Sequence, residues 1–327
     1  MARIGLVLGA GGIVGNAFHA GVLAALQQEV EWDPREADLV VGTSAGSVTG
    51  TGLRLGVSPA DMAAFATERP MSPAGEAFFT ALDRADQDLP APSATDLLRG
   101  WRLPSAALLA RSARRPWALR PAAAASTLLP SGRFDLQERT RVLDELSPAW
   151  PDGLWICAAR RDHGRRVVFG RPGSPPATLA AAVAASCAIP AYFAPVTIGT
   201  KQYVDGGVHS TTNADVLAST GLDLVIVVAP MSAAHGRSSR ADAPMRWAMH
   251  RRLDREVRRL RDAGTEVIRI EPSAGTLSAM GLNAMADDRS ASVVEAAYAD
   301  TAALTATPAT RFRLAALRDR VVHHPAA

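Results

Sequence analysis

The chain has 327 residues, of which 48% are hydrophobic, so it can bury a substantial core as one large domain or two modest ones. Its 35 basic and 32 acidic residues nearly cancel to a formal net charge of +3, which does not call for a nucleic-acid partner. The two cysteines and seven histidines show no ligand spacing, so the sequence implies neither a metal nor a cofactor.

The first predicted strand, residues 3–8, runs directly into the glycine-rich segment 9–15 and then into a helix. Such a loop leaves backbone N–H groups free at the positive end of a helix dipole, which suits an anion. A dinucleotide-binding turn fits poorly, because Val14 stands where the third glycine belongs and no acid ends the second strand. We favour an oxyanion hole, in which the N–H groups of Gly11 and Gly12 stabilise charge on a carbonyl oxygen.

The second predicted strand ends in Gly42-Thr43-Ser44-Ala45-Gly46. In this Gly-x-Ser-x-Gly pattern, small flanking residues let a strained strand-to-helix turn push the serine hydroxyl out of the backbone. Ser44 is therefore the candidate nucleophile, and the N–H of Ala45 is a third candidate oxyanion donor. The alternative is a plain N-cap serine, because short patterns recur by chance and serine commonly caps helices.

Residues 96–135 are unusual because no acid lies between Asp96 and Asp135. The segment combines arginines with tryptophans and leucine pairs, a mixture that suits a lid over a lipid pocket or a segment facing an anionic membrane. An Ala/Pro-rich insertion without special function is the equal alternative. The basic residues are Arg99, Arg102, Arg111, Arg114, Arg115, Arg120 and Arg133.

A hairpin is predicted at residues 154–169, and a later short strand ends in Tyr203-Val204-Asp205-Gly206-Gly207. The two glycines let a carboxylate lie at a sharp turn with little bulk around it, so Asp205 is the candidate general base. No histidine is well placed for a triad. His209 is expected to face solvent in the turn, and His19 to be packed or capping. The others lie in a small-residue loop, an arginine-rich helix or the terminus: His235, His250, His323 and His324.

The last third of the chain contains a continuous apolar run at residues 222–229 and another strand at 265–270. Strands that alternate with helices predict a three-layer α/β/α domain with a mainly parallel central sheet. Between these strands, residues 244–264 form an arginine-rich helix. Its arginines are expected to be solvated or paired with Asp254, Glu256 and Asp262, and a face toward phospholipid is the alternative.

Taken together, the glycine loop, the serine elbow and residues 184–207, which end in Asp-Gly-Gly, resemble the patatin-like phospholipase family. The resemblance implies a hydrolase domain over residues 1–310, a C-terminal tail at 311–327, and a phospholipid or other fatty acyl ester as substrate. It also implies an acyl-enzyme on Ser44 with Asp205 as base. The family usually has Arg or Lys at the position of Val14, so this chain lacks a basic side chain there that could stabilise an oxyanion or an anionic head group. An α/β-hydrolase is disfavoured, since only one strand precedes the strand of Ser44.

No apolar run is long enough to span a bilayer. Glycines interrupt the apolar segment at the N-terminus, which argues against a signal peptide. We therefore expect a cytoplasmic enzyme that contacts anionic membrane surfaces from outside the bilayer. Two other functions stay open: a nucleotide-binding oxidoreductase that uses the glycine loop, and a catalytically silent lipid-binding relative.

Overall fold

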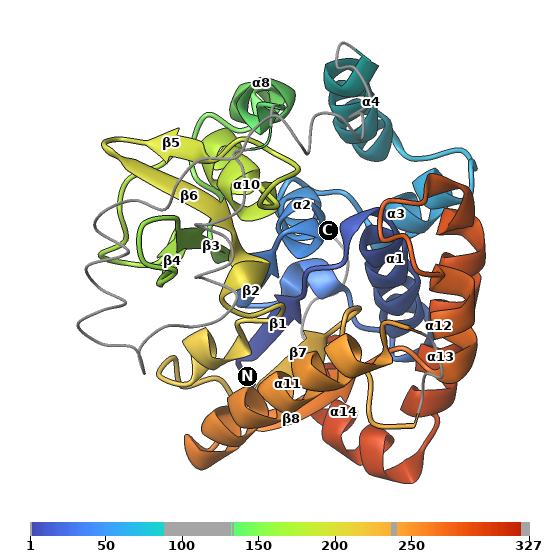
Figure 1. Cartoon of the computed structure of the whole chain (residues 1–327). Helices are drawn as coiled ribbons and strands as arrows, with labels where there is room; N and C mark the ends of the chain where they lie inside the picture. The colour runs from blue at the N-terminus through green and yellow to red at the C-terminus, as the bar shows by residue number, and fades with distance from the viewer. Residues whose placement is uncertain (1, 88–131, 133, 237–240, 322–327) are drawn as a thin grey trace. The chain divides into compact units, whose positions relative to one another are not determined.

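The computed structural model describes residues 2–87, 132, 134–236 and 241–321 (Figure 1). The chain divides into two compact units. The first unit combines Met1–Ala77 with Thr211–Ala327, and the second is Phe78–Ser210. The predicted lid at residues 96–135 falls almost entirely outside the described residues.

The first unit is built on four parallel strands in the order β2-β1-β7-β8. All five residues of β1 and of β7 are buried, as expected for apolar strands covered on both faces. In register, Leu8 at the end of β1 lies beside Gly42 of β2 and Val228 of β7, so these strands end at one edge. The strands are β1 (Ile4–Leu8), β2 (Leu39–Thr43), β7 (Leu224–Val228) and β8 (Glu266–Ile270).

Helices flank this sheet, and α1 lies beside α13 (Figure 1). Gly21 permits this approach, because a Cβ there would lie 2.9 Å from the Cβ of Ala297. The predicted α/β architecture with a mainly parallel central sheet is confirmed. The helices are α1 (Gly12–Glu29), α2 (Ala45–Arg54), α3 (Pro59–Ala66), α11 (Ala243–Asp262), α12 (Ala274–Met280), α13 (Ser290–Thr305) and α14 (Pro308–Val321), with short turns η1 (Pro34–Glu36), η4 (Ala214–Leu217) and η5 (Asp287–Arg289). Helix α4 (Pro73–Gln87) begins in this unit and crosses the residue 77/78 division.

The second unit holds four antiparallel strands in the order β5-β6-β3-β4. The hairpin predicted at residues 154–169 is confirmed, with Ile156 opposite Phe169. Its elements are α8 (Leu136–Thr140), α9 (Val142–Leu146), β3 (Leu154–Arg160), β4 (Arg166–Phe169), α10 (Leu179–Cys187), β5 (Val196–Ile198), β6 (Lys201–Asp205) and η3 (Gly206–Val208).

The last helix bears on the expected boundary between the hydrolase domain and the C-terminal tail. Helix α14 begins at Pro308 and continues to Val321, so the boundary at residue 310 falls within its first turn.

Every helix in the described ranges is too short or too polar to cross a bilayer.

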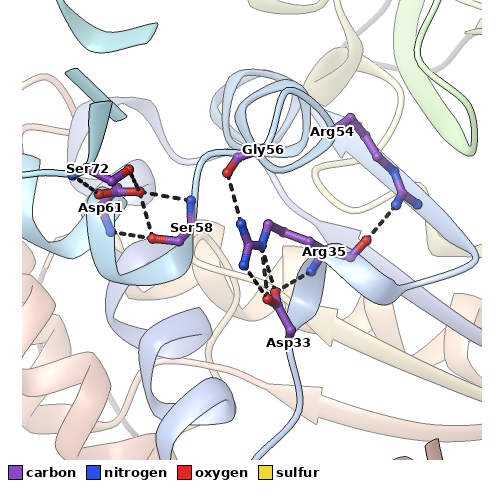
Figure 2. Close-up of polar contacts among 7 residues, drawn as sticks. All are labelled: Asp33, Arg35, Arg54, Gly56, Ser58, Asp61 and Ser72. Carbon is purple, nitrogen blue, oxygen red and sulfur yellow. Dashed lines mark hydrogen bonds and ion pairs between the residues drawn. The ribbon is translucent and has the colours of Figure 1, made fainter. Parts of the chain in front are cut away.

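Helix α3 begins at a buried carboxylate network, shown in Figure 2. Ser58 Oγ accepts from the N–H of Asp61 at 3.0 Å, and Asp61 Oδ2 accepts from the N–H of Ser58 at 3.2 Å, which completes a capping box. Ser72 adds its N–H at 2.7 Å and its hydroxyl at 2.8 Å. Burial alone would raise the pKa of Asp61, but the hydrogen bonds from Ser72 and Ser58 outweigh it and lower the pKa below its ordinary value.

A second polar cluster in Figure 2 anchors the carboxyl end of α2. Arg35 forms a 2.6 Å ion pair with Asp33 and donates to the carbonyl of Gly56 at 3.0 Å. Arg54, at the end of α2, donates to the carbonyl of Arg35 at 2.9 Å. These bonds hold the end of α2 against the segment that precedes β2.

The Ser58 hydroxyl also donates to Asp61 Oδ2 at 2.7 Å, so the carboxylate accepts four hydrogen bonds. Replacing Asp61 with Asn should lower the free energy of unfolding by about 2 kcal/mol at neutral pH, since this charged acceptor is lost. The lowered pKa in the folded state means that this contribution is complete above the ordinary carboxyl pKa of 3.8 and is lost as the pH falls through the folded-state pKa. Urea unfolding of both proteins across a pH series measures the difference. Glu76→Gln, at an exposed carboxylate in the first turn of α4, is the control and should change little.

Candidate active site

Ser44 lies at the turn between β2 and α2 in a strained backbone conformation. Its φ of 52° and ψ of −122° are rare for a residue with a side chain. The residue is buried, with 5% of its surface exposed, and its side chain makes no capping hydrogen bond to α2. The alternative of a plain N-cap serine is therefore wrong, and the strained turn is the one that the Gly-x-Ser-x-Gly pattern predicts.

The two glycines of this pattern are required by close backbone packing. A Cβ on Gly42 would lie 2.5 Å from the carbonyl oxygen of Gly46 and from the Cα of Ser47. A Cβ on Gly46 would collide with the carbonyl of Leu8 at the end of β1. Both glycines therefore let α2 begin directly against the sheet.

The glycine loop leaves β1 at the same edge of the sheet. Gly9 donates its N–H to the carbonyl of Val228 at 2.9 Å, which extends the pairing of β1 with β7. A Cβ on Gly11 would lie 2.6 Å from the Cα of Gly15. Gly12 has a φ of +63°, and a Cβ there would lie 2.5 Å from the carbonyl oxygen of Ala284. The loop thus tolerates no side chain at either position predicted to donate to an oxyanion.

The first turns of α1 and α2 present uncapped backbone donors. Neither helix has a side-chain cap or an acidic residue in its first turn, whereas α3, α10 and α12 are all capped by a serine or threonine. Among the described residues, the N–H groups of Gly11, Gly12 and Ala45 have no hydrogen-bond acceptor. A Cβ on Gly15 would lie 3.6 Å from the Cβ of Ala45, so the beginnings of the two helices are in contact. This arrangement concentrates the positive ends of two helix dipoles at one place.

Asp205 ends β6 in the second unit. Its carboxylate Oδ1 accepts from the N–H of Gly207 at 2.6 Å, and its own N–H donates to the carbonyl of Ala188 at 2.9 Å. The residue is 5% exposed. The Asp-Gly-Gly turn therefore does what its sequence predicts: it holds a buried carboxylate in one orientation, with a glycine N–H as the fixing donor.

The segment after this turn, residues 211–214, was not singled out by the sequence. In the first unit, the carbonyl of Thr211 accepts from the N–H of Ala10 in the glycine loop at 2.7 Å. The amide of Asn213 donates to Thr43 Oγ1, next to Ser44, at 3.1 Å. Asn213 is fully buried in a left-handed conformation, with φ 54° and ψ 24°, which asparagine tolerates better than most residues. One short segment thus holds both the glycine loop and the elbow, and we call it the junction.

Glu256 of α11 fixes the junction from the other side. Its Oε2 accepts from the hydroxyl of Thr212 at 2.6 Å and from the N–H of Ala214 at 2.9 Å, and its Oε1 pairs with Arg252 at 3.2 Å. With 1% exposure, it is a core residue. The expectation that Glu256 pairs with arginines of this helix is met by Arg252. The position of Glu256 in an arginine-rich helix gave no sign in the sequence that its carboxylate would be buried and would bind the junction.

His19 and His209 each contact an oxygen of their own unit. Burial lowers the pKa of His19 to about 3, and the carbonyl of Gly9 opposes this shift without forming a regular hydrogen bond to the ring. His19 Nδ1 lies 3.2 Å from Thr49 Oγ1, so a neutral imidazole joins α1 to α2. The expectation that His19 is packed is confirmed. His209 Nδ1 lies 3.5 Å from the carbonyl of Gly164, and the residue is half-buried against that turn of its own unit. Within the described ranges, no three His, Cys, Asp or Glu side chains are grouped to hold a metal ion.

The hydrogen bond between Asn213 and Thr43 gives a testable prediction. Asn213→Gly keeps the left-handed backbone but removes the amide, and Thr43→Val keeps the shape but removes the acceptor. Each should lower kcat on a soluble ester on the order of 10-fold, because a small misplacement of the nucleophile is costly. The double variant should be no worse than either single one. Thr301→Val, at a buried threonine of α13, is the control. Additive losses, or unchanged rates, would show that this bond does not position Ser44.

Solved structures of two bacterial proteins are similar to this chain at low identity. VipD from Legionella pneumophila is 13% identical, with a TM-score of 0.42 over 93% of this chain and 67% of VipD. ExoU, in its heterodimeric complex with SpcU from Pseudomonas aeruginosa, is 18% identical, with a TM-score of 0.34 over 93% of this chain and 51% of that chain. The chain therefore spans about half the length of ExoU. No curated protein matches the chain by sequence.

A family model also matches the chain. The model described as patatin-like phospholipase matches residues 6–218, which is more than half of the chain. The match includes the glycine loop, the elbow, the Asp-Gly-Gly turn and the junction. The chain belongs to the patatin-like phospholipase family.

Proposed function

We propose that this protein is a serine lipid acyl hydrolase, of the esterase or phospholipase A type, with Ser44 as nucleophile and Asp205 as general base. Family membership supports a lipid hydrolase. The observation that carries the proposal is the pair of uncapped helix beginnings at the glycine loop and the elbow, with the strained Ser44 between β2 and α2. A structural serine requires neither the strain nor the unused donors.

In the acylation step, the Ser44 hydroxyl attacks the ester carbonyl while the Asp205 carboxylate accepts its proton. The carbonyl π electrons move to oxygen, and the N–H groups of Gly11, Gly12 and Ala45 stabilise the resulting negative charge. Because these donors are fixed backbone groups at the positive ends of two helices, little reorganisation is needed when charge develops.

The tetrahedral intermediate then collapses, and the leaving alcohol takes the proton from Asp205 as the bond to it breaks. In deacylation, Asp205 removes a proton from water, the resulting nucleophile attacks the acyl-enzyme, and Ser44 regains its proton as the fatty acid leaves. The hydrogen bond from Gly207 would keep the carboxylate oriented through both steps.

We propose phospholipids or other fatty acyl esters as substrates, because the family is one of phospholipases. The proposed location is the cytoplasm, with peripheral contact to anionic membranes. Labelling by a fluorophosphonate probe tests the proposal without knowledge of the lipid. Labelling of the wild type, with none of Ser44→Ala, is expected. A catalytically silent lipid-binding relative would show no labelling and no hydrolysis of a short p-nitrophenyl ester.

Ser44→Ala and Asp205→Asn should each abolish turnover to a comparable residual rate, because the two groups act as a unit. Both variants should keep the wild-type melting temperature within a few degrees. His209→Gln and His19→Gln are the controls and should retain most of the rate. Retained activity in Asp205→Asn together with its loss in His209→Gln would replace the dyad with a triad.

The oxyanion role gives a second prediction. Gly12→Ala should lower kcat on the order of 10²-fold, with a smaller change in KM, because the new Cβ meets the carbonyl of Ala284 and displaces a donor. Gly15→Ala is the matched control, since its Cβ would make only ordinary contacts, the nearest at 3.6 Å. A change in KM alone would mean that the loop binds the ground state of the substrate.

A further inference from the structure

Helix α11 carries an exposed face that differs from the rest of its surface. Trp247, Arg251, Arg255 and Arg258 recur at spacings of four and three residues, which places them on one side of the helix. Trp247 is 41% exposed, and Met245, two residues earlier in the first turn and therefore on another side of the helix, is 44% exposed. The opposite side is buried in the unit through Leu253, Glu256, Val257 and Leu260. We call the exposed set of Trp247, Arg251, Arg255 and Arg258 the α11 surface.

Two of the three acids of α11 are engaged elsewhere, and the third, Asp262, is exposed at the last position of the helix, four residues after Arg258. Asp254 pairs with Arg269 and lies 3.6 Å from His250, and Glu256 holds the junction. Within the described part of the chain, no acidic side chain forms an ion pair with Arg251, Arg255 or Arg258. The guanidinium of Arg251 instead lies 5.4 Å from the centre of the Trp247 ring. The surface therefore carries an excess of positive charge, three arginines against Asp262, next to an exposed tryptophan.

The apolar end of the α11 surface lies at the edge of the sheet from which the glycine loop emerges. Helix α11 follows β7, whose carboxyl end lies beside that of β1. Arg246, in the first turn of α11, donates to the carbonyl of Pro230 at 2.9 Å. A Cβ on Gly11 would lie 3.0 Å from Pro230 Cβ, so Pro230 also packs on the glycine loop. Met245 and Trp247 thus flank the same end of the unit as the predicted oxyanion donors.

We propose that the α11 surface docks the protein on anionic phospholipid bilayers. Arginine guanidinium groups bind phosphate oxygens, and tryptophan side chains enter the boundary between headgroups and acyl chains. The exposed tryptophan at the end near the glycine loop favours a bilayer over a nucleic acid, for which phosphate contacts alone would be enough. The choice of a lipid partner rests on the proposed function, and the docking itself is measured without turnover.

The test is co-sedimentation of the full chain, in the Ser44→Ala background, with vesicles of phosphatidylcholine or of an equimolar mixture with phosphatidylserine. Arg251→Gln/Arg255→Gln/Arg258→Gln should weaken binding to the mixed vesicles on the order of 100-fold, since each arginine near an anionic surface contributes a factor of about 5. Trp247→Ala should weaken binding on the order of 10-fold and reduce the remaining binding at high salt.

The matched control is Arg69→Gln/Arg141→Gln/Arg171→Gln, which removes the same charge from exposed arginines on other elements. Binding that falls equally in both triple variants, or in neither, overturns the proposal, as does equal binding of the wild type to duplex DNA under the same conditions. In the Ser44-containing protein, the α11 variant should be labelled by a soluble fluorophosphonate at the wild-type rate. Absence of labelling in every variant would remove the proposed function and leave the vesicle result standing.

Discussion

The candidate site depends on one buried junction, where residues 211–214 hydrogen-bond to two loops at once. Thr211 fixes the glycine loop through Ala10, and Asn213 fixes the elbow through Thr43. Glu256 in turn fixes the junction with a buried carboxylate. A buried charge is costly unless it is fully hydrogen-bonded, and here it accepts from a hydroxyl, a backbone N–H and a guanidinium. The junction therefore joins α11 to both candidate catalytic loops.

The hydrogen bonds of the junction hold in place two local features that cost stability. Ser44 has a strained backbone, and two helices begin without caps, which forgoes about 1 kcal/mol of stabilisation at each. Ser58 and Asp61 cap α3 in the ordinary way, and side chains also cap α10 and α12, whereas α9, α11 and α13 begin without a side-chain cap as α1 and α2 do. What distinguishes α1 and α2 is that their uncapped beginnings lie in contact with each other, at the glycine loop and the elbow.

The electrostatics of these loops come from the backbone, because ionisable side chains contribute little there. His19 is kept neutral by burial, and Val14, where the family usually has a basic residue, is 3% exposed. Positive potential is therefore supplied by the beginnings of α1 and α2. Arg251, Arg255 and Arg258 of α11 lie on its exposed side, where they suit contact with an anionic surface better than stabilisation of an oxyanion.

The sequence alone predicted the α/β fold, the strained elbow, the glycine loop and the carboxylate of the Asp-Gly-Gly turn. These features follow from local rules: apolar strands ending in glycines, and backbone conformations that only small residues permit. Asn213 and Glu256 could not be predicted, because their roles depend on partners 170 and 42 to 44 residues away in the chain. That Arg251, Arg255 and Arg258 form no ion pair with a described acid likewise depends on the partners that Asp254 and Glu256 find in the folded chain. Local conformation was determined by sequence pattern, whereas long-range hydrogen bonds and the distribution of charge were decided by the packing of α11 on the sheet.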